Sequence, residues 1–436
     1  METNSMRISS QSRRYAKVQN LMHNVNEQNL MAQHRHQKLH KAPGIDKVDK
    51  QRYETHVNEN IGKLVQEMKK LQYRPLPVRR AYIDKGNGKM RPLGIPAYED
   101  RLVQGAMADI LNQVYEPRFL DCSMGFRPNR SAHDTVAYIN QVIMCRKVNY
   151  VLEADIRGFF DNVNHDWMMK FLANDIDDKN FLRYVKRFLI AGIMEGTEYH
   201  ESDKGTPQGG QISPILANVY LHYVLDLWVT AVKKHIRGQI YYVRYADDFI
   251  IMFQYWDDAQ KVMTALKPRL AKFSLELAEE KTRIFKFGRF AENKEEFDFL
   301  GFTFFNTHTA KGKYRVGIRT SKKKLKAKRQ KAKEWLKTRL NKNVTETMKL
   351  IRVSLLGHYN YYGVNGNYTQ MRKFYEYLKY VTHKMLNRRS ERAYMRWGKF
   401  NKIWDYHIPK PKITKNIWNW SVKTCLLYTS PSPRDA

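Results

Sequence analysis

The chain has 436 residues, which is too long for one ordinary hydrophobic core and predicts two or three domains. Lys and Arg total 77 against 43 Asp and Glu, so the formal net charge is +34, and a charge of this size points to a polyanion such as nucleic acid as the partner. The three cysteines have no metal-ligand spacing, and neither a signal peptide nor a run of about eighteen apolar residues is evident, which argues against a disulfide scaffold, a structural zinc module and a membrane protein.

Residues 1–41 are polar and basic, and we expect them to form an N-terminal extension. The apolar residues between positions 21 and 31 predict one side of a short helix. Three histidines follow without a neighbouring acidic or Cys partner, so we interpret them as surface residues and not as metal ligands: His34, His36 and His40.

Residues 75–96 have the pattern of a β-hairpin, and a helix is predicted before them at 53–71. The Gly-Asn-Gly tip of this hairpin is flanked by Lys85 and Arg91. Taken alone, the pattern predicts only a soluble hairpin. Two cations on paired strands are also suited to a bound triphosphate, because Arg offers phosphate a bidentate pair of donors.

A helix is predicted at 100–115, and a loop with two cations leads into a further helix that Ser131 is placed to cap. We interpret His133 as an ordinary helix residue and not as a general base. Helical sequence is predicted again up to about residue 194.

Residues 240–253 read as a strand, a tight turn with Asp247 and Asp248, and a returning strand. An acidic pair in a turn is most often solvated. A second acidic strand at 150–156 changes this balance, because it would bring Asp155 beside the pair. Such a carboxylate cluster could hold two Mg²⁺ ions, the arrangement that stabilises attacking and leaving oxygens in phosphoryl transfer.

Carboxylates at the end of a buried hairpin need a neutralising partner, since unpaired charge away from water is costly. A divalent cation is one candidate and Arg244 is another. The Gly-rich stretch at 205–214 either is a linker or brings Gln208 near a base or sugar edge, because glycine permits close approach of a backbone or ligand.

The remaining central sequence predicts a helix at 259–273, a connecting strand at 275–284 and a tight apolar hairpin at 297–304. This mixture predicts an α+β sheet covered by helices. Between residues 321 and 340 there are ten Lys or Arg and one Glu around an apolar stripe, so we predict a helix with a basic outer face. The aromatic and basic residues that alternate beyond it suit phosphate contact and base stacking, or ordinary helix packing.

The motifs occur in one order: a basic hairpin, Gly-Phe-Arg-Pro, Glu-Ala-Asp, Thr-Pro-Gln-Gly-Gly, Tyr-Ala-Asp-Asp and Phe-Leu-Gly-Phe. This ordered set resembles the reverse transcriptases encoded by group II introns of bacteria and organelles, over residues 42–413. The resemblance implies a right-hand polymerase of the α+β class, with fingers and palm at 42–310 and an all-helical thumb and maturase domain at 311–424. The activity it implies is RNA-directed DNA synthesis, together with a role in intron splicing.

The resemblance also implies roles for individual residues. Two Mg²⁺ ions would be bound by Asp155, Asp247, Asp248 and the backbone of Ile156. The incoming dNTP would be contacted by Lys85, Arg91, Phe160, Gln208, Gly209 and Lys281, with Phe160 as the steric gate that excludes a ribose 2′-OH. RNA would be contacted by Arg79, Arg80, Arg127, Arg130, Lys322, Lys323, Lys324, Lys328, Arg329, Arg388 and Arg389.

The expected partners are intron RNA, an RNA template, a DNA primer or target and dNTPs, without a membrane, in the bacterial cytoplasm beside the nucleoid or in an organelle. Asp84 stands where the family usually has Pro. The sequence has no Cys cluster of the kind that would indicate a zinc-type endonuclease. Residues 425–436 resemble a translated sequencing adapter, so we expect this tail not to be native. Two other functions remain open: a splicing maturase with secondary or no polymerase activity, and a domesticated reverse transcriptase in phage defence or repair.

Overall fold

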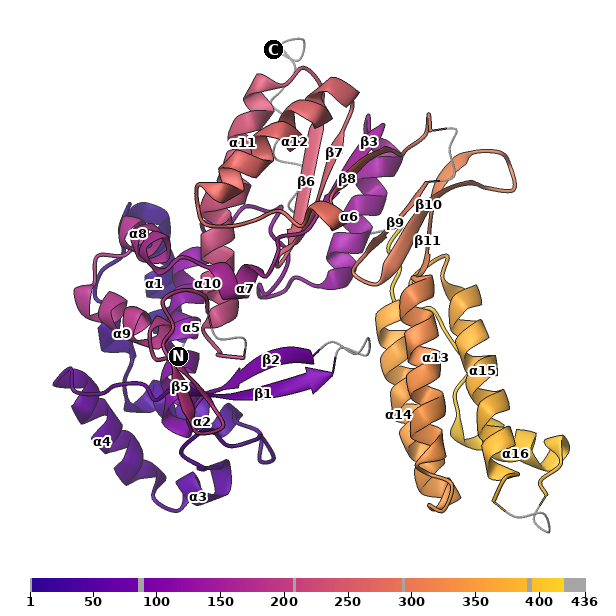
Figure 1. Cartoon of the computed structure of the whole chain (residues 1–436), viewed down its shortest axis with the longest axis horizontal. Coiled ribbons are helices and arrows are strands. Elements are labelled where there is room, and N and C mark those ends of the chain that lie inside the picture. Colours follow the sequence, from indigo (N-terminus) through magenta and orange to yellow (C-terminus); the bar gives the residue numbers. More distant parts are fainter. Residues whose placement is uncertain (1, 85–89, 207–208, 292–294, 390–393, 419–436) are drawn as a thin grey trace. The chain divides into compact units, whose positions relative to one another are not determined.

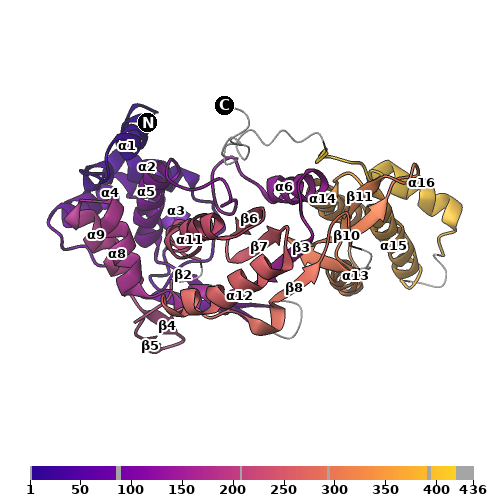
Figure 2. The same ribbon diagram turned by 90° about the horizontal axis from the view of Figure 1, so that it is seen from above.

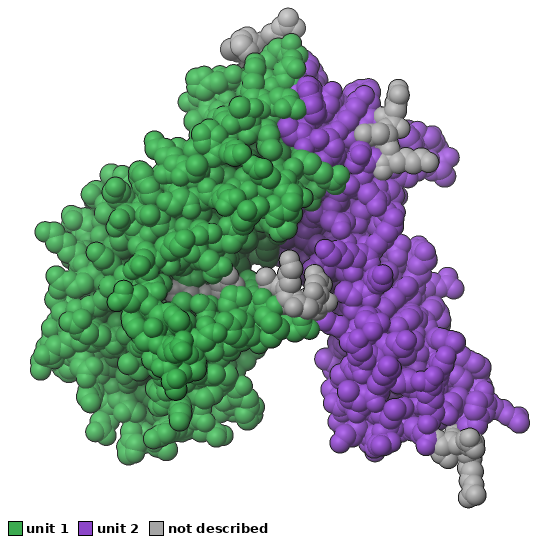
Figure 3. Space-filling model, viewed as in Figure 1, with its two compact units in different colours: residues 1–130, 152–251, 257–283 green, residues 131–151, 252–256, 284–436 purple. Residues whose placement is uncertain are grey.

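The computed structural model describes residues 2–84, 90–206, 209–291, 295–389 and 394–418. Helices and strands are mixed along this chain, which confirms the predicted α+β class. The contacts divide the chain into two compact units (Figure 3). Unit 1 comprises Met1–Arg130, Leu152–Ile251 and Asp257–Arg283, and unit 2 comprises Ser131–Val151, Met252–Trp256 and Ile284–Ala436. The predicted tail at 425–436 lies outside the described residues.

Unit 1 is built around the helix α5 (Tyr98–Tyr115), which is buried along most of its length. Helices α1, α2 and α10 pack against it, so the polar N-terminal stretch is a folded part of this unit. Its helices are α1 (Glu2–Arg14), η1 (Met22–Asn24), α2 (Glu27–His36), α3 (Lys50–Glu54), α4 (Val57–Lys69), α5, α7 (Phe159–Asn162), α8 (His165–Asp175), α9 (Lys179–Leu189), α10 (Ser213–Leu221), η2 (His222–Asp226), α11 (Leu227–Val232), η3 (Lys233–His235), α12 (Trp256–Ala271) and η4 (Glu279–Lys281).

The predicted basic hairpin is confirmed and belongs to a four-stranded sheet of unit 1. The sheet has the order β2-β1-β4-β5, with β1 (Val78–Asp84), β2 (Met90–Ile95), β4 (Ile193–Glu195) and β5 (Glu198–His200). Strands β1 and β2 are antiparallel, and Ile83 pairs with Arg91 near the tip. The tip itself, with Lys85, lies outside the described residues.

The acidic strands lie in a second four-stranded sheet of order β6-β7-β3-β8. Its strands are β6 (Ile240–Tyr245), β7 (Asp248–Phe253), β3 (Tyr150–Ala154) and β8 (Arg283–Lys286). Every residue of β7 after Asp248 is buried, as expected for a central strand rich in β-branched and aromatic side chains. The central position of β7 and β3 places the two acidic segments on neighbouring strands.

The longest apolar helical stretch of the described chain covers Ser213–His235, that is α10, η2, α11 and η3. It is long and apolar enough to cross a membrane by length and composition alone, but 67% of its most apolar window is buried. Burial of this kind is typical of a core helix. A π-helical segment, His222–Asp226, interrupts it, and such segments often occur near functional sites.

Unit 2 contains a three-stranded sheet of order β11-β10-β9, with β9 (Glu296–Phe299), β10 (Phe302–His308) and β11 (Tyr314–Thr320). Leu300 and Gly301 have φ of 50° and 78°, the signature of the two-residue turn predicted for this hairpin. Helix α6 (Ala132–Cys145) packs on β11, and Ser131 caps it in a capping box, as predicted. His133 is a helix residue whose Nε2 lies 2.7 Å from the Tyr361 carbonyl oxygen, which supports its interpretation as structural.

The remainder of unit 2 is helical. It consists of α13 (Lys322–Lys337), α14 (Val344–Tyr362), α15 (Tyr368–Leu386) and α16 (Trp397–His407). Helices α13, α14 and α15 run side by side in both ribbon views (Figures 1 and 2). The core that these three helices share with α16 includes Leu325, Leu336, Met348, Phe374 and Trp404, so the apolar stripe predicted for the basic helix faces this core.

The structure differs from the sequence-based predictions in three respects. The strand expected at 275–284 begins only at Arg283, because the chain first makes the turn η4 after one bridge between Leu277 and Ile156. Strands β4, β5 and β11 were not predicted. His34 is not a surface residue: it is 3% exposed, its Nδ1 lies 3.0 Å from the Tyr98 hydroxyl, and burial lowers its pKa.

Candidate active site

The turn between β6 and β7 consists of Ala246 and Asp247, and Asp248 begins the returning strand. Ala246 has φ of 57°, in the left-handed region that an L-residue with a side chain rarely adopts. The sequence therefore folds here into a tight, strained turn that brings two successive carboxylates to the end of a buried sheet. The structure agrees with the predicted strand, turn and strand.

Asp155 follows the neighbouring strand β3 and lies close enough to raise the pKa of both Asp247 and Asp248. The Asp155 side chain is partly buried, and the ammonium group of Lys281 donates a hydrogen bond to its Oδ2. The Asp155 carbonyl accepts from the Ala278 amide at 2.8 Å. The loop 275–282 therefore holds Asp155 in place and pairs its carboxylate with the Lys281 ammonium group.

Burial is the main cause that raises the pKa of Asp247 and Asp248. For Asp248 the neighbouring Asp247 and Asp155 carboxylates add to it, and the pKa is raised to about 7 although the side chain keeps access to water. Two cations oppose these effects at Asp247, namely Arg91 and Lys281. The site thus gathers more negative charge than its own cations neutralise, and a further cation would stabilise it.

The carboxylates fit a hard divalent cation by their chemistry, since Mg²⁺ binds carboxylate oxygens. Among the residues that the structure describes, no group of three or more His, Cys, Asp or Glu side chains is already gathered in a metal-binding arrangement. Lys281 accounts for part of this, because it binds the Asp155 oxygen that a metal ion would need. The buried Ile156, predicted as a backbone ligand, follows Asp155 directly.

Four of the predicted dNTP-binding residues are described and belong to unit 1, namely Arg91, Phe160, Gly209 and Lys281. Arg91, on β2, is exposed and close enough to lower the pKa of Asp247. Phe160 is partly buried, and its carbonyl accepts from the Thr206 amide at 2.7 Å. At Gly209 a Cβ would lie 2.4 Å from the Gly94 oxygen, so glycine allows this loop to pack on β2. Lys85 and Gln208 lie outside the described residues, and the nucleotide-binding roles stay predictions.

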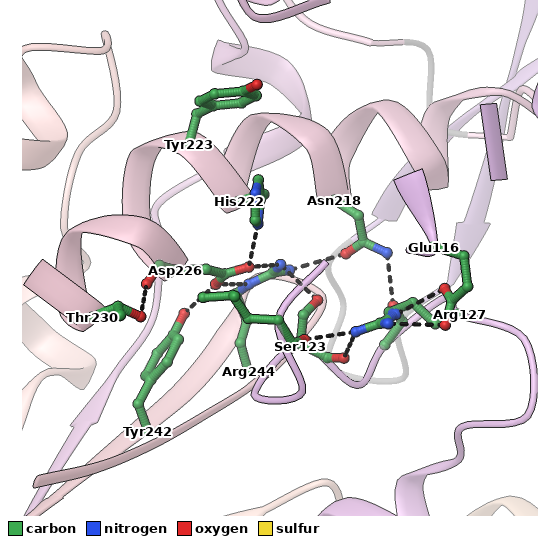
Figure 4. A network of polar contacts seen from close by, with 12 residues as sticks. Glu116, Ser123, Arg127, Asn218, His222, Tyr223, Asp226, Thr230, Tyr242 and Arg244 are labelled. Atoms are coloured by element: carbon green, nitrogen blue, oxygen red, sulfur yellow. Dashed lines mark hydrogen bonds and ion pairs between the residues drawn. The ribbon is translucent and has the colours of Figure 1, made fainter. Parts of the chain in front are cut away.

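Arg244 does not neutralise the turn carboxylates as proposed from the sequence. Its guanidinium is fully buried and bound to Asp226, with Nη2 at 2.7 Å from Oδ2 and Nε at 2.8 Å from Oδ1 (Figure 4). The reason is tertiary: the π-helical segment turns Asp226 toward the back of β6. Sequence reasoning missed Asp226, and an acidic residue within an otherwise apolar helix was the signal that could have found it.

The predicted RNA-binding residues differ in exposure. Lys322, Lys323, Lys324 and Arg388 are exposed, and Arg79, Arg80, Arg130, Lys328, Arg329 and Arg389 are partly buried. Arg127 is buried and forms a bidentate ion pair with Glu116, at 2.8 and 2.9 Å, which gives it a structural role in its loop. RNA contact by these residues stays a prediction.

Comparison with known proteins shows the family to which this chain belongs. The family described as reverse transcriptase (RNA-dependent DNA polymerase) matches residues 83–304, about half of the chain, and this segment contains all three aspartates. The Group II intron-encoded protein LtrA of Lactococcus lactis subsp. cremoris is 36% identical over 52% of this chain and 47% of its own length. Protein YkfC of Escherichia coli is 35% identical over 48% of this chain and 63% of its own length.

The chain therefore belongs to the reverse transcriptase family. Its motifs and relatives place its resemblance within that family among the group II intron-encoded reverse transcriptases and maturases, as predicted. A further relative is Nuclear intron maturase 2, mitochondrial, of Arabidopsis thaliana, 28% identical over 22% of this chain and 13% of its own length. The chain spans about half the length of LtrA and less than two thirds of YkfC.

Proposed function

We propose that this protein is an RNA-directed DNA polymerase of a group II intron that also assists splicing as an RNA-binding maturase. The observation that carries the proposal is the juxtaposition of Asp155 with Asp247 and Asp248 on neighbouring central strands, within the segment that matches the reverse transcriptase family. A protein that only binds RNA would gain nothing from three neighbouring carboxylates, two of which have pKa values raised by burial and by the charges of the others.

In the proposed nucleotidyl transfer, each of the predicted site residues would have its own role. Asp155, Asp247 and Asp248 would hold two Mg²⁺ ions, which lower the pKa of a primer 3′-hydroxyl and neutralise the leaving pyrophosphate. Arg91 and Lys85 would bind the triphosphate, and Phe160 would pack under the sugar and exclude a 2′-OH. Lys281 would exchange its bond to Asp155 for a contact with the leaving group. In this proposal fingers and palm cover residues 42–310 and the thumb follows.

The basic helix α13 supports the maturase role. It carries exposed Lys322, Lys323 and Lys324 in its first turn while Leu325 and Leu336 face the helical core. Cations on an exposed helix face bind phosphates without reading sequence. Intron RNA, an RNA template and a DNA primer are the proposed partners, and the bacterial cytoplasm or an organelle is the proposed location.

The test is Mg²⁺-dependent extension of a DNA primer on an RNA template by the purified protein and by Asp247→Ala. We expect the variant to lose extension entirely while it binds structured RNA within about twofold of wild type, because charge stabilisation at the transition state is lost and the basic surfaces are untouched. Asp166→Ala, an exposed carboxylate of α8 in the same unit, is the matched control and should extend normally.

Extension retained by Asp247→Ala would overturn the catalytic assignment. If wild type and variant both fail to extend but bind structured RNA tightly and promote intron splicing, the protein is a maturase without polymerase activity. Absence of an intron RNA fold around the coding frame would instead favour a domesticated enzyme in phage defence or repair.

A further inference from the structure

Arg244 is the most completely satisfied charged side chain of the network behind the carboxylate turn (Figure 4). An arginine has five N–H donors, and here all of them are used. Nε and Nη2 bind Asp226, and Nη2 also donates to Ser123 Oγ at 2.7 Å. Nη1 donates to Asn218 Oδ1 and to the Ala246 carbonyl oxygen, both at 3.0 Å. Five bonds from a planar group fix it in one orientation.

The bond to Ala246 connects this network to the catalytic turn. Ala246 immediately precedes Asp247, and its left-handed backbone costs about 1–2 kcal/mol in an L-residue. A strained conformation persists only where the surroundings determine it. The carbonyl side of Ala246 is held by Arg244, which therefore stabilises a conformation that alanine does not favour.

The amide side of Ala246 is enclosed as well. A Cβ at Gly125 would lie 2.4 Å from the Ala246 nitrogen, so the backbones of the two segments are in direct contact. Asn218 donates to the Gly125 carbonyl at 2.8 Å and accepts from Arg244, which joins both sides of the turn to the helix α10. The turn is held between a loop, a helix and an arginine.

The anchor of Arg244 is itself rigid. Asp226 is fully buried in the π-helical segment and accepts a further hydrogen bond from the Tyr242 hydroxyl at 2.8 Å. Burial lowers the pKa of the nearby His222, whose Nδ1 lies 3.9 Å from Asp226 Oδ2, so Arg244, at 2.7 Å from the same oxygen, is the closer partner. The Arg244 guanidinium cannot shift without breaking bonds to two helical segments, to the loop that contains Ser123 and to the carboxylate turn.

We propose that Arg244 is a positioning residue that, through the Ala246 carbonyl, sets where Asp247 and Asp248 lie relative to Asp155 and thereby sets the affinity for divalent cations. This inference rests on the proposed function of the three carboxylates. Arg244 is fully buried and its five donors are all bound within the protein, so it would act through the turn and not by contact with substrate or metal. Its effect on metal affinity should still be large, since partners that orient metal ligands typically change the affinity by about 10–100-fold.

The test compares Arg244→Lys with Arg118→Lys. Lysine keeps a positive charge for Asp226 but has no planar fork that reaches Asn218 and Ala246 as well. Arg118 is also an arginine of unit 1 bound to a carboxylate, Asp175, and its other acceptors are Ser12 Oγ and the Tyr15 and Ala16 carbonyls, none of them in the turn.

Binding of Mn²⁺, a paramagnetic probe for the Mg²⁺ sites, would be measured by electron paramagnetic resonance, beside the Mg²⁺ concentration for half-maximal extension and the KM for primer–template. Arg244→Lys should weaken Mn²⁺ binding at least tenfold and raise the Mg²⁺ requirement similarly, with the KM unchanged. Arg118→Lys should lose thermal stability but keep wild-type Mn²⁺ binding. Asn218→Ala, which leaves the Arg244–Asp226 pair intact, should shift Mn²⁺ binding in the same direction by a smaller factor.

Unchanged Mn²⁺ binding in Asn218→Ala and in folded Arg244→Lys would overturn the inference, and so would an equal shift in Arg118→Lys. If Arg244→Lys does not fold, Asn218→Ala decides. Failure of the wild type to extend primers would contradict the proposed polymerase, whereas the Mn²⁺ comparison would still decide whether Arg244 positions the carboxylates. Equal Mn²⁺ binding by wild type and Asp247→Ala would overturn both.

Discussion

Arg244, fully buried in unit 1, and Lys328, partly buried in unit 2, are two cations whose charges are balanced in opposite ways. Arg244 in unit 1 is bound to Asp226; burial opposes its charge, but the carboxylate outweighs burial and the pKa of Arg244 is raised. Lys328 in unit 2 lies 3.1 Å from His358 Nδ1 and above the Phe374 ring, with no carboxylate partner in the described part of the chain, and burial lowers its pKa to about 8. The burial of a cation stabilises a structure only where the partner's charge and geometry offset the desolvation.

The two sites also differ in what they do to their surroundings. The Arg244 network joins a strand, a loop and a helix around the carboxylate turn, whereas Lys328 and His358 join two helices of the bundle. The pKa of His358 is lowered further from its usual value than that of Lys328, because burial and then the Lys328 charge lower it to about 3. We therefore expect the protein to lose stability when the carboxylate partner of Arg244 is removed, and to gain stability when the charge of Lys328 is removed.

The largest expected effect follows removal of Asp226. Asp226→Leu should lower the free energy of unfolding of the protein by about 3–5 kcal/mol, because Arg244 is left buried and uncompensated. Urea unfolding measures the change. The double variant Asp226→Leu with Arg244→Met should recover most of the stability but not the Mn²⁺ affinity, which separates the structural role of the pair from its positioning role. A loss below 1 kcal/mol in the single variant would contradict the comparison.

The second effect is pH-dependent stability of the helical bundle of unit 2. Lys328 has a lower pKa folded, about 8, than in an unfolded chain, about 10.5, so the unfolded state binds more protons in this window and stability rises with pH across it. The full rise is about 3 kcal/mol, at about 1.4 kcal/mol for each unit. Hydrogen exchange of α14 and α15 peptides measures it.

Lys328→Met should therefore exceed the wild type in bundle stability at pH 7.5, and the difference should shrink by pH 9.5. Lys326→Met, which removes an exposed lysine of the same helix, is the matched control and should show no such pH dependence. A Lys328→Met bundle less stable than wild type at pH 7.5 would mean that the cation on Phe374 stabilises more than its burial costs.

The smallest effect concerns the outer part of the Arg244 network. Tyr242→Phe removes the buried hydrogen bond to Asp226 and should cost about 1 kcal/mol in urea unfolding, since Arg244 still satisfies the carboxylate. Tyr241→Phe, whose hydroxyl binds Gln239 at an exposed position, should cost less. Mn²⁺ binding should be unchanged in both, because neither hydroxyl touches Ala246. Weakened Mn²⁺ binding in Tyr242→Phe would mean that Asp226 also helps to position the carboxylates.

The local elements around the site could be predicted because their signals are local. Alternation of β-branched and aromatic residues around Asp247 predicted a hairpin, and Ser131 followed by Asp134 supplied a helix cap. The short strands β4 and β5 escaped prediction because three residues carry too little periodicity, and His34 because its partner Tyr98 lies far along the chain.

The partner of Arg244 could not be predicted, because residue spacing does not show which way a π-helical segment turns its side chains. The same holds for Arg127, for which the family resemblance implied contact with RNA and which the fold pairs with Glu116. Whether a charged residue contacts solvent, a ligand or an internal partner depends on its burial, and burial is a property of the whole fold.

The sequence by itself determined the α+β class, the order of motifs, the three carboxylates and the basic face of α13, since each depends on residues close together in the chain. Only the tertiary structure decided that Asp155 pairs with Lys281, that Asp226 pairs with Arg244, and that Ala246 is held in a strained conformation between Arg244 and Gly125. The physical reason is that these contacts join residues on separate strands, helices and loops, and their geometry exists only once the core has packed.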